Sequence, residues 1–507
     1  MISIITPFFF AQDYNTPSAS RAAIDCTGRG VMIRAGSLPP SARQQGIRVL
    51  SQHPQSRAIL AMVLLNSFAV PLMLSAANVA LPTMGDNLAM TAVAMSWVPM
   101  AFLMASTMFV LIFGRLSDRV GRKRIFLIGS AAVIVSSVLT SLAPSGELLL
   151  AARFLQGVSA AALNATQMAI VSSAFPANQR GRYIGLVTAS IYIGLSAGPL
   201  LGGLVVDHIS WRASFLVHLP LVVAVLGLGL FYVHDEWRGE ADARFDVPGA
   251  LGWIASIGLF CLAISRLPAW DSFAWLAASA VTVTLFLHHA RRSPHPLWDV
   301  NLFFTNRTFT LSAASALIMY SATYANVVLM SLYLQSVKGM SASQAGMIMM
   351  VQPLTMAIGS PIMGRLSDRL EPRWLASAGM ALTACGLFVL ATLHPDSSTT
   401  RVVIALLFTG GGFALFSSPN VNAIMGSVER RHYGSASAAV ATTRMVGQLN
   451  SMVLVALVVS LIVGNTVINE DSIPQLSRAI DVCFAIAGLV CLPGIAFSLA
   501  RGRLHRQ

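Results

Sequence analysis

Long apolar runs recur along almost the whole chain. From about residue 57 the sequence repeats one unit, an apolar run followed by a short polar loop. Fourteen runs are counted, near residues 58–82, 94–113, 125–143, 148–172, 183–206, 213–233, 248–266, 271–289, 308–335, 342–363, 374–393, 402–422, 437–463 and 479–500. About 20 mainly apolar residues cross a bilayer core of about 30 Å as one helix. The runs therefore predict an all-α polytopic membrane protein with fourteen transmembrane helices.

The composition excludes several other classes of protein. Of 507 residues, 55% are hydrophobic and only 10% are charged, whereas charged residues make up about a quarter of a soluble domain. So few charges cannot cover a water-facing surface, which argues against a soluble enzyme or a disordered chain. The five cysteines lack ligand spacing and no phosphate-binding loop occurs, so we expect no metal, no cofactor and no enzymatic activity.

The basic residues define a topology. The net charge is +13, and with both termini on one side of the membrane, 26 of the 33 Lys and Arg fall on that side. Five fall on the other side and two lie inside predicted spans. Lys and Arg collect on cytoplasmic loops, so this bias predicts a plasma (inner) membrane protein with both termini cytoplasmic. The excess charge is explained by the bilayer and not by nucleic acid.

An internal repeat divides the chain. Gly114-Arg-Leu-Ser-Asp-Arg119 recurs identically as Gly364-Arg-Leu-Ser-Asp-Arg369, in each case after an apolar run and at the start of an inner loop. Eight predicted spans separate the copies, which indicates a parallel repeat of two six-span halves with two extra spans between them. The predicted segments are a disordered cytoplasmic tail (1–56), an N-terminal half (57–236), two inserted helices (237–300), a C-terminal half (301–500) and a cytoplasmic tail (501–507).

The motifs resemble those of one transporter family. The segment from Gly114 to Arg124 resembles the signature loop between the second and third helices of the major facilitator superfamily. Fourteen spans are similar to its drug/proton antiporter branch. Further matches are Trp97-Val98, Arg153–Gly157, Gly194–Gly203, Trp211-Arg212, Tyr333–Gln335 and Arg444–Gly447. The resemblance implies the major-facilitator fold and proton-coupled efflux of a small molecule.

The repeated hexapeptide is a candidate conformational latch. A carboxylate just beyond a helix end can cap the positive N-terminus of a neighbouring helix or pair with Arg, and such contacts can break when the transporter changes state. The alternative is that the loop only fixes topology. The second copy departs from the pattern after Arg369. The latch candidates are Gly114, Asp118, Arg119, Gly121, Arg122, Gly364, Asp368 and Arg369.

Three residues are candidates for proton coupling. Arg153 and Arg444 lie inside predicted spans, where a charged side chain is functional by default. The resemblance links Arg153 to proton coupling, whereas bracing of helix packing is the alternative for both arginines. His218 follows Trp211 at a position that is usually Asn in the family; it is either a titratable group or an ordinary packed histidine.

A glycine-rich run resembles the fifth-helix motif of exporters. The candidate packing residues are Gly194, Gly198, Pro199, Gly202 and Gly203. Glycines four residues apart share one helix face and allow close helix approach, and the proline can kink the helix.

The expected acidic residue of the first span is missing. Relatives in this branch carry an acidic residue before Asn78-Val-Ala-Leu-Pro82, but Met73 occupies that position here. This departure argues against a cationic substrate and leaves neutral and anionic substrates as possibilities. Transporters with two halves bind near the midplane between them, where the polar and aromatic candidates are Asn78, Gln156, Tyr320, Tyr324, Gln352 and Asn420.

The leading hypothesis is proton-coupled export of small amphipathic compounds by alternating access. The alternative is proton-coupled transport of a specific metabolite, neutral or anionic, and a remote alternative is a membrane sensor that does not transport. The expected partners are the small-molecule substrate, protons and the lipid bilayer. A periplasmic adaptor protein, or none, fits the sequence equally well.

Overall fold

The structure is a computed structural model that describes residues 54–176, 179–239, 245–267, 269–367, 369–428 and 433–502. Among these residues the regular structure is helical, apart from a single antiparallel bridge between Thr91 and Val467. Fourteen helices in this part of the chain are long and apolar enough to cross a membrane. The prediction of an all-α, fourteen-span membrane protein is confirmed. Most of both predicted tails lies outside the described residues.

The N-terminal half contains six of the spans. Its elements are α3 (Pro54–Val79), the short α4 (Leu81–Asn87), α5 (Ala92–Val120), α6 (Arg122–Ser141), α7 (Gly146–Ala174), α8 (Arg180–His208), the 3₁₀ turn η2 (Trp211–Phe215) and α9 (Leu219–Phe231). Within the half, α5 packs against α7, α3 against α8 and α6 against α7.

Two inserted helices follow, α10 (Val247–Ser265) and α11 (Asp271–Arg292), which pack against each other. α10 also contacts α5 and α19, so the inserted pair lies beside both halves. The sequence places these two spans correctly although their edges are weak.

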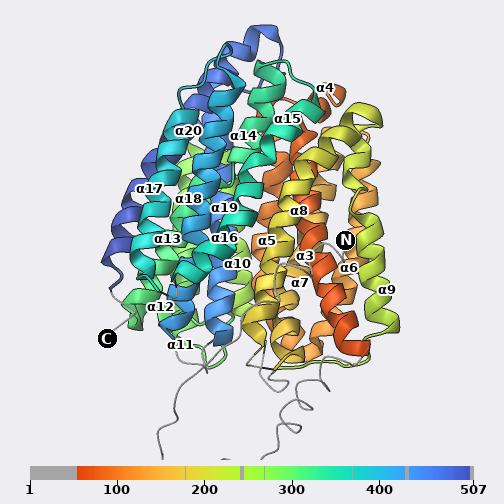
Figure 1. Ribbon diagram of the computed structural model, residues 1–507, viewed down its shortest axis with the longest axis vertical. Coiled ribbons are helices and arrows are strands. Elements are labelled where there is room, and N and C mark those ends of the chain that lie inside the picture. The colour runs from red at the N-terminus through yellow and green to blue at the C-terminus, as the bar shows by residue number, and fades with distance from the viewer. Residues whose placement is uncertain are drawn as a thin grey trace, which may run out of the picture. The chain divides into compact units, whose positions relative to one another are not determined.

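The C-terminal half contains the other six spans. Its elements are α12 (Asn301–Thr305), α13 (Arg307–Thr323), α14 (Asn326–Leu332), the π-helical η3 (Tyr333–Val337), α15 (Ala342–Met349), α16 (Val351–Ser367), α17 (Pro372–Leu390), α18 (Thr399–Gly426), α19 (Tyr433–Ile462), the 3₁₀ turn η5 (Glu470–Ser472) and α20 (Ile473–Ala500). One span is built from α13, α14 and η3, and another from α15 and α16. In Figure 1 the red-to-yellow helices of the first half lie beside the green-to-blue helices of the second.

The two halves repeat local structure as well as sequence. The hydroxyl of Thr91 caps α5, and the hydroxyl of Ser341 caps α15, which starts the corresponding span of the second half. At the other end of these spans, Ser117 Oγ donates to the Gly114 carbonyl and Ser367 Oγ to the Gly364 carbonyl, both at 2.7 Å. Hydroxyl side chains at corresponding positions thus make the same hydrogen bonds in both halves.

One expectation about the repeated hexapeptide needs correction. We expected both copies to begin loops, but Gly114 to Val120 forms the last turns of α5, and Gly364 to Ser367 ends α16. Polar residues can continue a helix beyond the hydrocarbon core, where its exposed side chains meet water and headgroups. The connection between α5 and α6 is reduced to Gly121 alone. We call the end of the bundle at Gly121 the basic end.

α5 packs against α19 across the interface of the halves, and further contacts join the halves at the opposite end. There α8 packs against α15, and α14 contacts both α3 and α4. Gln335 Nε2 donates to the Val79 carbonyl at 2.9 Å, and the Ala92 N–H donates to the Thr466 carbonyl at 2.9 Å. These bonds join the two halves across the end that faces away from the basic loops.

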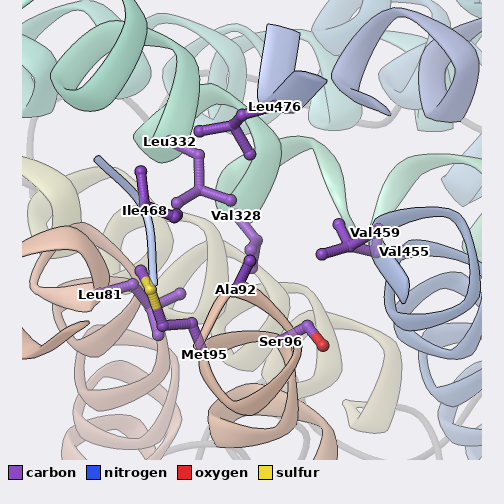
Figure 2. Close-up of a pocket in the computed structure, with 10 residues that line it drawn as sticks. All are labelled: Leu81, Ala92, Met95, Ser96, Val328, Leu332, Val455, Val459, Ile468 and Leu476. Atoms are coloured by element: carbon purple, nitrogen blue, oxygen red, sulfur yellow. The ribbon is translucent and has the colours of Figure 1, made fainter. Parts of the chain in front are cut away.

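A small pocket lies between the halves at this opposite end. It encloses about 320 Å³ of empty space, part of it open to solvent. Figure 2 shows its lining, which is apolar except for Ser96: Leu81, Ala92, Met95, Ser96, Val328, Leu332, Val455, Val459, Ile468 and Leu476. Residues from α4 and α5 face residues from α14, α19 and α20 across it.

Candidate functional site

The first copy of the hexapeptide contacts both the N-terminal half and the segment of the inserted helices, where Arg115 Nη2 donates to the Pro296 carbonyl at 2.6 Å. Arg122 Nη2 donates to Asp118 Oδ1 at 2.7 Å, and Arg122 Nε donates to the same oxygen at 3.0 Å. Arg122 also donates to the Ala169 carbonyl at 3.3 Å and to the Ser173 hydroxyl, both on α7. Of the two possibilities left open for Asp118, pairing with Arg is the one observed in this conformation.

The cap on α6 comes from a residue that sequence reasoning missed. Glu236, in the segment after α9, accepts the backbone N–H of Lys123 at 2.9 Å and that of Arg124 at 3.2 Å. Gly121 makes room for it, because a Cβ at Gly121 would lie 2.5 Å from the Glu236 carboxyl carbon. Gly121 also has φ of +124°, a conformation that favours glycine. Glycine is therefore required here on two counts.

The second copy is open at its first glycine, as the first copy is. A Cβ added to Gly364 would meet only Ser418, at 3.6 Å, and one added to Gly114 would meet nothing within 4 Å. Asn422 Nδ2 donates to Ser367 Oγ at 2.7 Å, which ties α18 to α16. Arg369 begins the connection to α17, and Asp368 lies outside the described residues. The latch predicted for this copy stays a prediction.

The glycine motif on α8 contacts α3 within the first half. A Cβ on Gly194 would lie 2.4 Å from the Phe68 carbonyl oxygen, and one on Gly198 would lie 2.4 Å from Ser75 Cβ. A Cβ on Gly202 would lie 2.7 Å from Ala76 Cα. These three glycines thus allow α8 to approach α3 closely, as their four-residue spacing indicates.

The same helix also contacts the other half. A Cβ on Gly203 would lie 2.3 Å from the Ala342 carbonyl oxygen, and one on Gly346 would lie 2.2 Å from the Pro199 carbonyl oxygen. Near the end of α8, Asp207 accepts the backbone N–H of Ala342 at 3.1 Å and that of Ser343 at 2.8 Å. The motif therefore positions α8 against α3 of its own half and against α15 of the other half.

Arg153 heads a buried polar chain in the N-terminal half. Its side chain is fully buried, and its Nη1 donates to Gln156 Oε1 at 2.6 Å. Gln156 Nε2 donates to Ser137 Oγ at 2.8 Å, and that hydroxyl lies 3.2 Å from His218 Nε2. His218 is also fully buried, and its Nδ1 has no hydrogen-bond partner. Two of the predicted coupling residues, Arg153 and His218, are thus joined through the side chains of Gln156, on α7, and Ser137, on α6.

The charge of Arg153 has no carboxylate partner among the described residues. Its Nε donates to the Val98 carbonyl at 3.2 Å, and its guanidinium carbon lies 4.9 Å from the centre of the Phe102 ring and 5.7 Å from that of Phe215. Inserting an Arg at a helix centre costs about 2.5–3.5 kcal/mol even on the most favourable scale. Carbonyls and ring faces therefore have to stabilise this cation.

Arg444 has a different environment, on α19 in the second half. Its side chain is half-buried, and it makes no hydrogen bond or ion pair in the described part of the chain. It lies within electrostatic range of the phenols of Tyr192, on α8, and Tyr320, on α13. Tyr192 Oη is 3.0 Å from Ser417 Oγ. Arg444 therefore lies where residues of both halves meet.

The helix that carries Tyr320 links the two arginines. Tyr324, one turn further along, lies within electrostatic range of Arg153. It marks the junction of α13 and α14, and broken helices are typical of transporter binding sites. Just beyond, Asn326 is buried with neither atom of its amide hydrogen-bonded. This junction is the part of the structure in which candidate residues from both halves come together.

The other predicted cavity residues lie on other helices. Asn78 and Gln352 are buried in α3 and α16. Asn420 lies in the C-terminal half, where its Nδ2 donates to the Ser312 carbonyl at 3.1 Å and its Oδ1 accepts from Arg501 Nη1 at 2.7 Å. Arg501 is 1% exposed although we assigned it to the tail. Burial lowers its pKa to about 10, while Glu371 favours its charged form.

Comparisons with known proteins agree with the fold and the motifs. A family profile described as Major Facilitator Superfamily matches residues 63–448 and 311–506. The chain is 34% identical over 376 residues to "Multidrug resistance protein Stp" of Mycobacterium tuberculosis (strain CDC 1551 / Oshkosh), covering 73% of this chain and 70% of that protein. It is 30% identical over 390 residues to "Riboflavin transporter RibZ" of Clostridioides difficile (strain 630), covering 77% of this chain and 85% of that protein.

Solved structures share the fold at low sequence identity. A bacterial homologue of the human lysosomal transporter Spinster, in an inward-facing and unoccupied conformation, superposes with a TM-score of 0.66 at 16% identity. The match covers 89% of this chain and 97% of that one. With the profile matching most of the chain, the predicted resemblance is confirmed: this multi-pass membrane protein belongs to the Major Facilitator Superfamily of transporters.

Proposed function

We propose that the protein exports small amphipathic compounds in exchange for protons, by alternating access. The observation that carries the proposal is the buried chain from Arg153 through Gln156 and Ser137 to His218. It contains a cation without a carboxylate partner and a histidine, the side chain whose ordinary pKa lies nearest neutrality. A proton on His218 would change the charge beside Arg153, and so the electrostatics of the first half.

The packing of the halves supports alternating access. In this conformation α8 and α15 meet at the end opposite the basic loops, while the side-chain hydrogen bonds of Asp118 and Arg122 stay within the first half. A state open at the basic end is expected to have this distribution of contacts. We assign the basic end and both termini to the cytoplasm, because basic residues collect there. Gly114 and Arg119 would then help to latch this end when it closes.

The energy of proton movement is sufficient for export. One proton that moves inward contributes about 2.3 kcal/mol per 100 mV. Since a tenfold concentration ratio corresponds to about 1.4 kcal/mol, this sustains a gradient of roughly 50-fold for a neutral substrate. Exchange with protons therefore needs no nucleotide, and the relative named as a multidrug resistance protein is consistent with export.

The test measures substrate-dependent proton movement in vesicles that contain the purified protein. We expect Arg153→Ala to abolish the proton flux. We expect His218→Asn to leave substrate binding intact but to make that binding less dependent on pH. Arg266→Ala is the matched control, because Arg266 pairs with Asp271 in an exposed ion pair away from this chain of residues. If the wild-type protein moves a compound without moving protons, antiport is wrong. If Arg153→Ala gives an undiminished flux, Arg153 has no part in coupling.

A second candidate is proton-coupled transport of one specific metabolite, neutral or anionic. Two observations favour it over cation export: Met73, fully buried, occupies the position of the expected acidic residue, and one relative is named as a riboflavin transporter. Competition experiments in the same vesicles separate the candidates, because an exporter with broad specificity is inhibited by many unrelated compounds and a specific transporter by few.

A further inference from the structure

Arg444 is a charged group in a membrane-spanning helix that nothing in the described chain neutralises. Its neighbours are neutral. Tyr320 lies beside Gly447, one turn after Arg444, and Tyr192 packs in the same cluster as Tyr320. Ser417 contacts Tyr192. Because the guanidinium makes no hydrogen bond to the described residues, all five of its N–H donors are available to a ligand.

The surrounding helices place further hydrogen-bonding groups at the same level. Ser360, on α16 near Tyr192, is 3% exposed. The ring of Phe413 lies 5.5 Å from that of Tyr320, so one side of the group is apolar and aromatic. Gly447, one turn after Arg444, lets α19 approach α13, since a Cβ there would lie 2.7 Å from Tyr320 Cβ.

The group spans the interface of the halves. Tyr192 belongs to α8 of the first half, whereas Arg444, Tyr320, Ser360 and Ser417 belong to four helices of the second half. A ligand held between Arg444 and Tyr192 would therefore contact both halves, and its presence would depend on their relative position. A bracing arginine is expected to bond carbonyls, as Arg153 does, and Arg444 does not.

We propose that Arg444, with the hydroxyls of Tyr192, Tyr320 and Ser360, binds the acidic group of an anionic, aromatic or amphipathic substrate. A carboxylate accepts two parallel N–H bonds from a guanidinium, phenol and serine hydroxyls can donate to its remaining lone pairs, and the Phe413 side suits an aromatic body. That this anion is transported rests on the proposed function, whereas its binding at Arg444 does not.

The probes are three compounds of similar size and different charge: 1-naphthoate, 1-naphthamide and 1-naphthylmethylammonium. Their binding to the full-length protein is measured by ligand-induced thermal stabilisation in nanodiscs of zwitterionic lipid. We expect naphthoate to bind more tightly than the other two, and Arg444→Gln to weaken naphthoate at least tenfold while leaving naphthamide unchanged. Arg444→Lys should retain part of the affinity, because it keeps the charge and loses the paired geometry.

Two further variants keep the test decisive if Arg444→Gln folds poorly. Tyr192→Phe and Tyr320→Phe remove one hydroxyl each and should weaken naphthoate severalfold, whereas Arg266→Gln, at an exposed ion pair, should change nothing. The proposal is overturned if naphthoate does not bind the wild-type protein, if it binds no better than naphthamide, or if Arg444→Gln binds it equally well.

Vesicle transport of the same compounds separates the two proposals. Export of naphthamide without binding of naphthoate would retain the transport function and remove the anion site. Binding of naphthoate that depends on Arg444, without transport of any compound, would retain the anion site and remove the transport function. If phosphatidylglycerol in the nanodiscs displaces naphthoate, a lipid headgroup is the occupant and the assignment to substrate is wrong.

Discussion

The carboxylate of Asp207, in the last turn of α8, accepts the backbone N–H of Ser343, in the first turn of α15, at 2.8 Å. The first residue belongs to the N-terminal half and the second to the C-terminal half. The neighbouring N–H of Ala342 donates to the same carboxylate at 3.1 Å. Because the free N–H groups at a helix start carry partial positive charge, a carboxylate there is stabilising. One side chain thus fastens the two halves at the end opposite the basic loops.

We expect Asp207→Asn to loosen this end of the transporter. An amide oxygen still accepts one N–H, but the charge is lost, which costs about 1 kcal/mol at a partly exposed helix start. The equilibrium should shift about fivefold toward states open at this end. Maleimide labelling of Ser96→Cys, in the pocket of Figure 2, reports the opening, in a background where exposed Cys385 is replaced.

The control for Asp207 is Asp271→Asn, which breaks an exposed ion pair with Arg266 in the inserted pair of helices. Labelling of Ser96→Cys should be unchanged in that variant. Equal labelling of the Asp207→Asn and wild-type proteins would show that the carboxylate does not hold the halves together.

Adding a single methyl group at Gly203 should change the conformation of the transporter more than its folding stability. A Cβ there would lie 2.3 Å from the Ala342 carbonyl oxygen in the other half, so Gly203→Ala should prevent full closure of α8 on α15. Gly198→Ala would press on Ser75 within the same half and should mainly lower the melting temperature.

Gly185→Ala is the matched control on the same helix, because nothing lies within 4 Å of its added Cβ. Labelling of Ser96→Cys and thermal unfolding, measured on all three variants, separate the two effects. If Gly203→Ala and Gly185→Ala behave alike in both measurements, the contact between α8 and α15 is not tight in the membrane.

The spans and the repeat could be predicted because they are local patterns. An apolar run predicts a helix whatever it packs against, and the spacing of Gly194, Gly198 and Gly202 defines a face of α8 without reference to α3. The caps made by Glu236 and Asp207 could not be predicted. Each carboxylate meets backbone N–H groups of a distant segment, and every helix offers such groups at its start.

The charged residues of the candidate site could be predicted, but their contacts could not. A charged residue inside an apolar run identifies Arg153 and Arg444 from the sequence alone. Their environments depend on which helices meet, so the sequence did not distinguish an arginine bonded to carbonyls from one without partners. Arg501 was missed because it follows the last apolar run, although the end of α20 is packed against Ser312 and Asn420.

Glu236 should contribute measurable stability through its cap on α6. It accepts two backbone N–H groups, those of Lys123 and Arg124, and loss of a helix cap costs about 0.5–2 kcal/mol. We expect Glu236→Ala to lower the melting temperature, with Asp235→Ala, an exposed neighbour, as the control. Identical melting of the two variants would mean that water replaces the cap at no cost.

Asp246 should give the stability of the inserted helices a defined dependence on pH. Its carboxylate caps α10 through the Gly249 N–H at 2.9 Å, accepts the Leu297 N–H at 3.0 Å and lies 2.7 Å from His289 Nε2 on α11. Burial alone would raise the pKa of Asp246, but these hydrogen bonds outweigh it and hold the pKa below its ordinary value of 3.8. A carboxylate with a depressed pKa stabilises the fold above its unfolded-state pKa, and this contribution is lost as the pH falls through the lower, folded-state pKa.

The difference in melting temperature between the wild-type protein and Asp246→Asn should therefore be constant from neutral pH down to about pH 4, and should shrink below it. Above about pH 4, loss of the charged cap should lower the free energy of unfolding by about 1–2 kcal/mol. Asp396→Asn, at an exposed carboxylate, should follow the wild-type curve throughout. A difference for Asp246→Asn that persists unchanged into strong acid would mean that the side chain acts through its shape and neutral hydrogen bonds, and that its charge does not fasten the inserted pair.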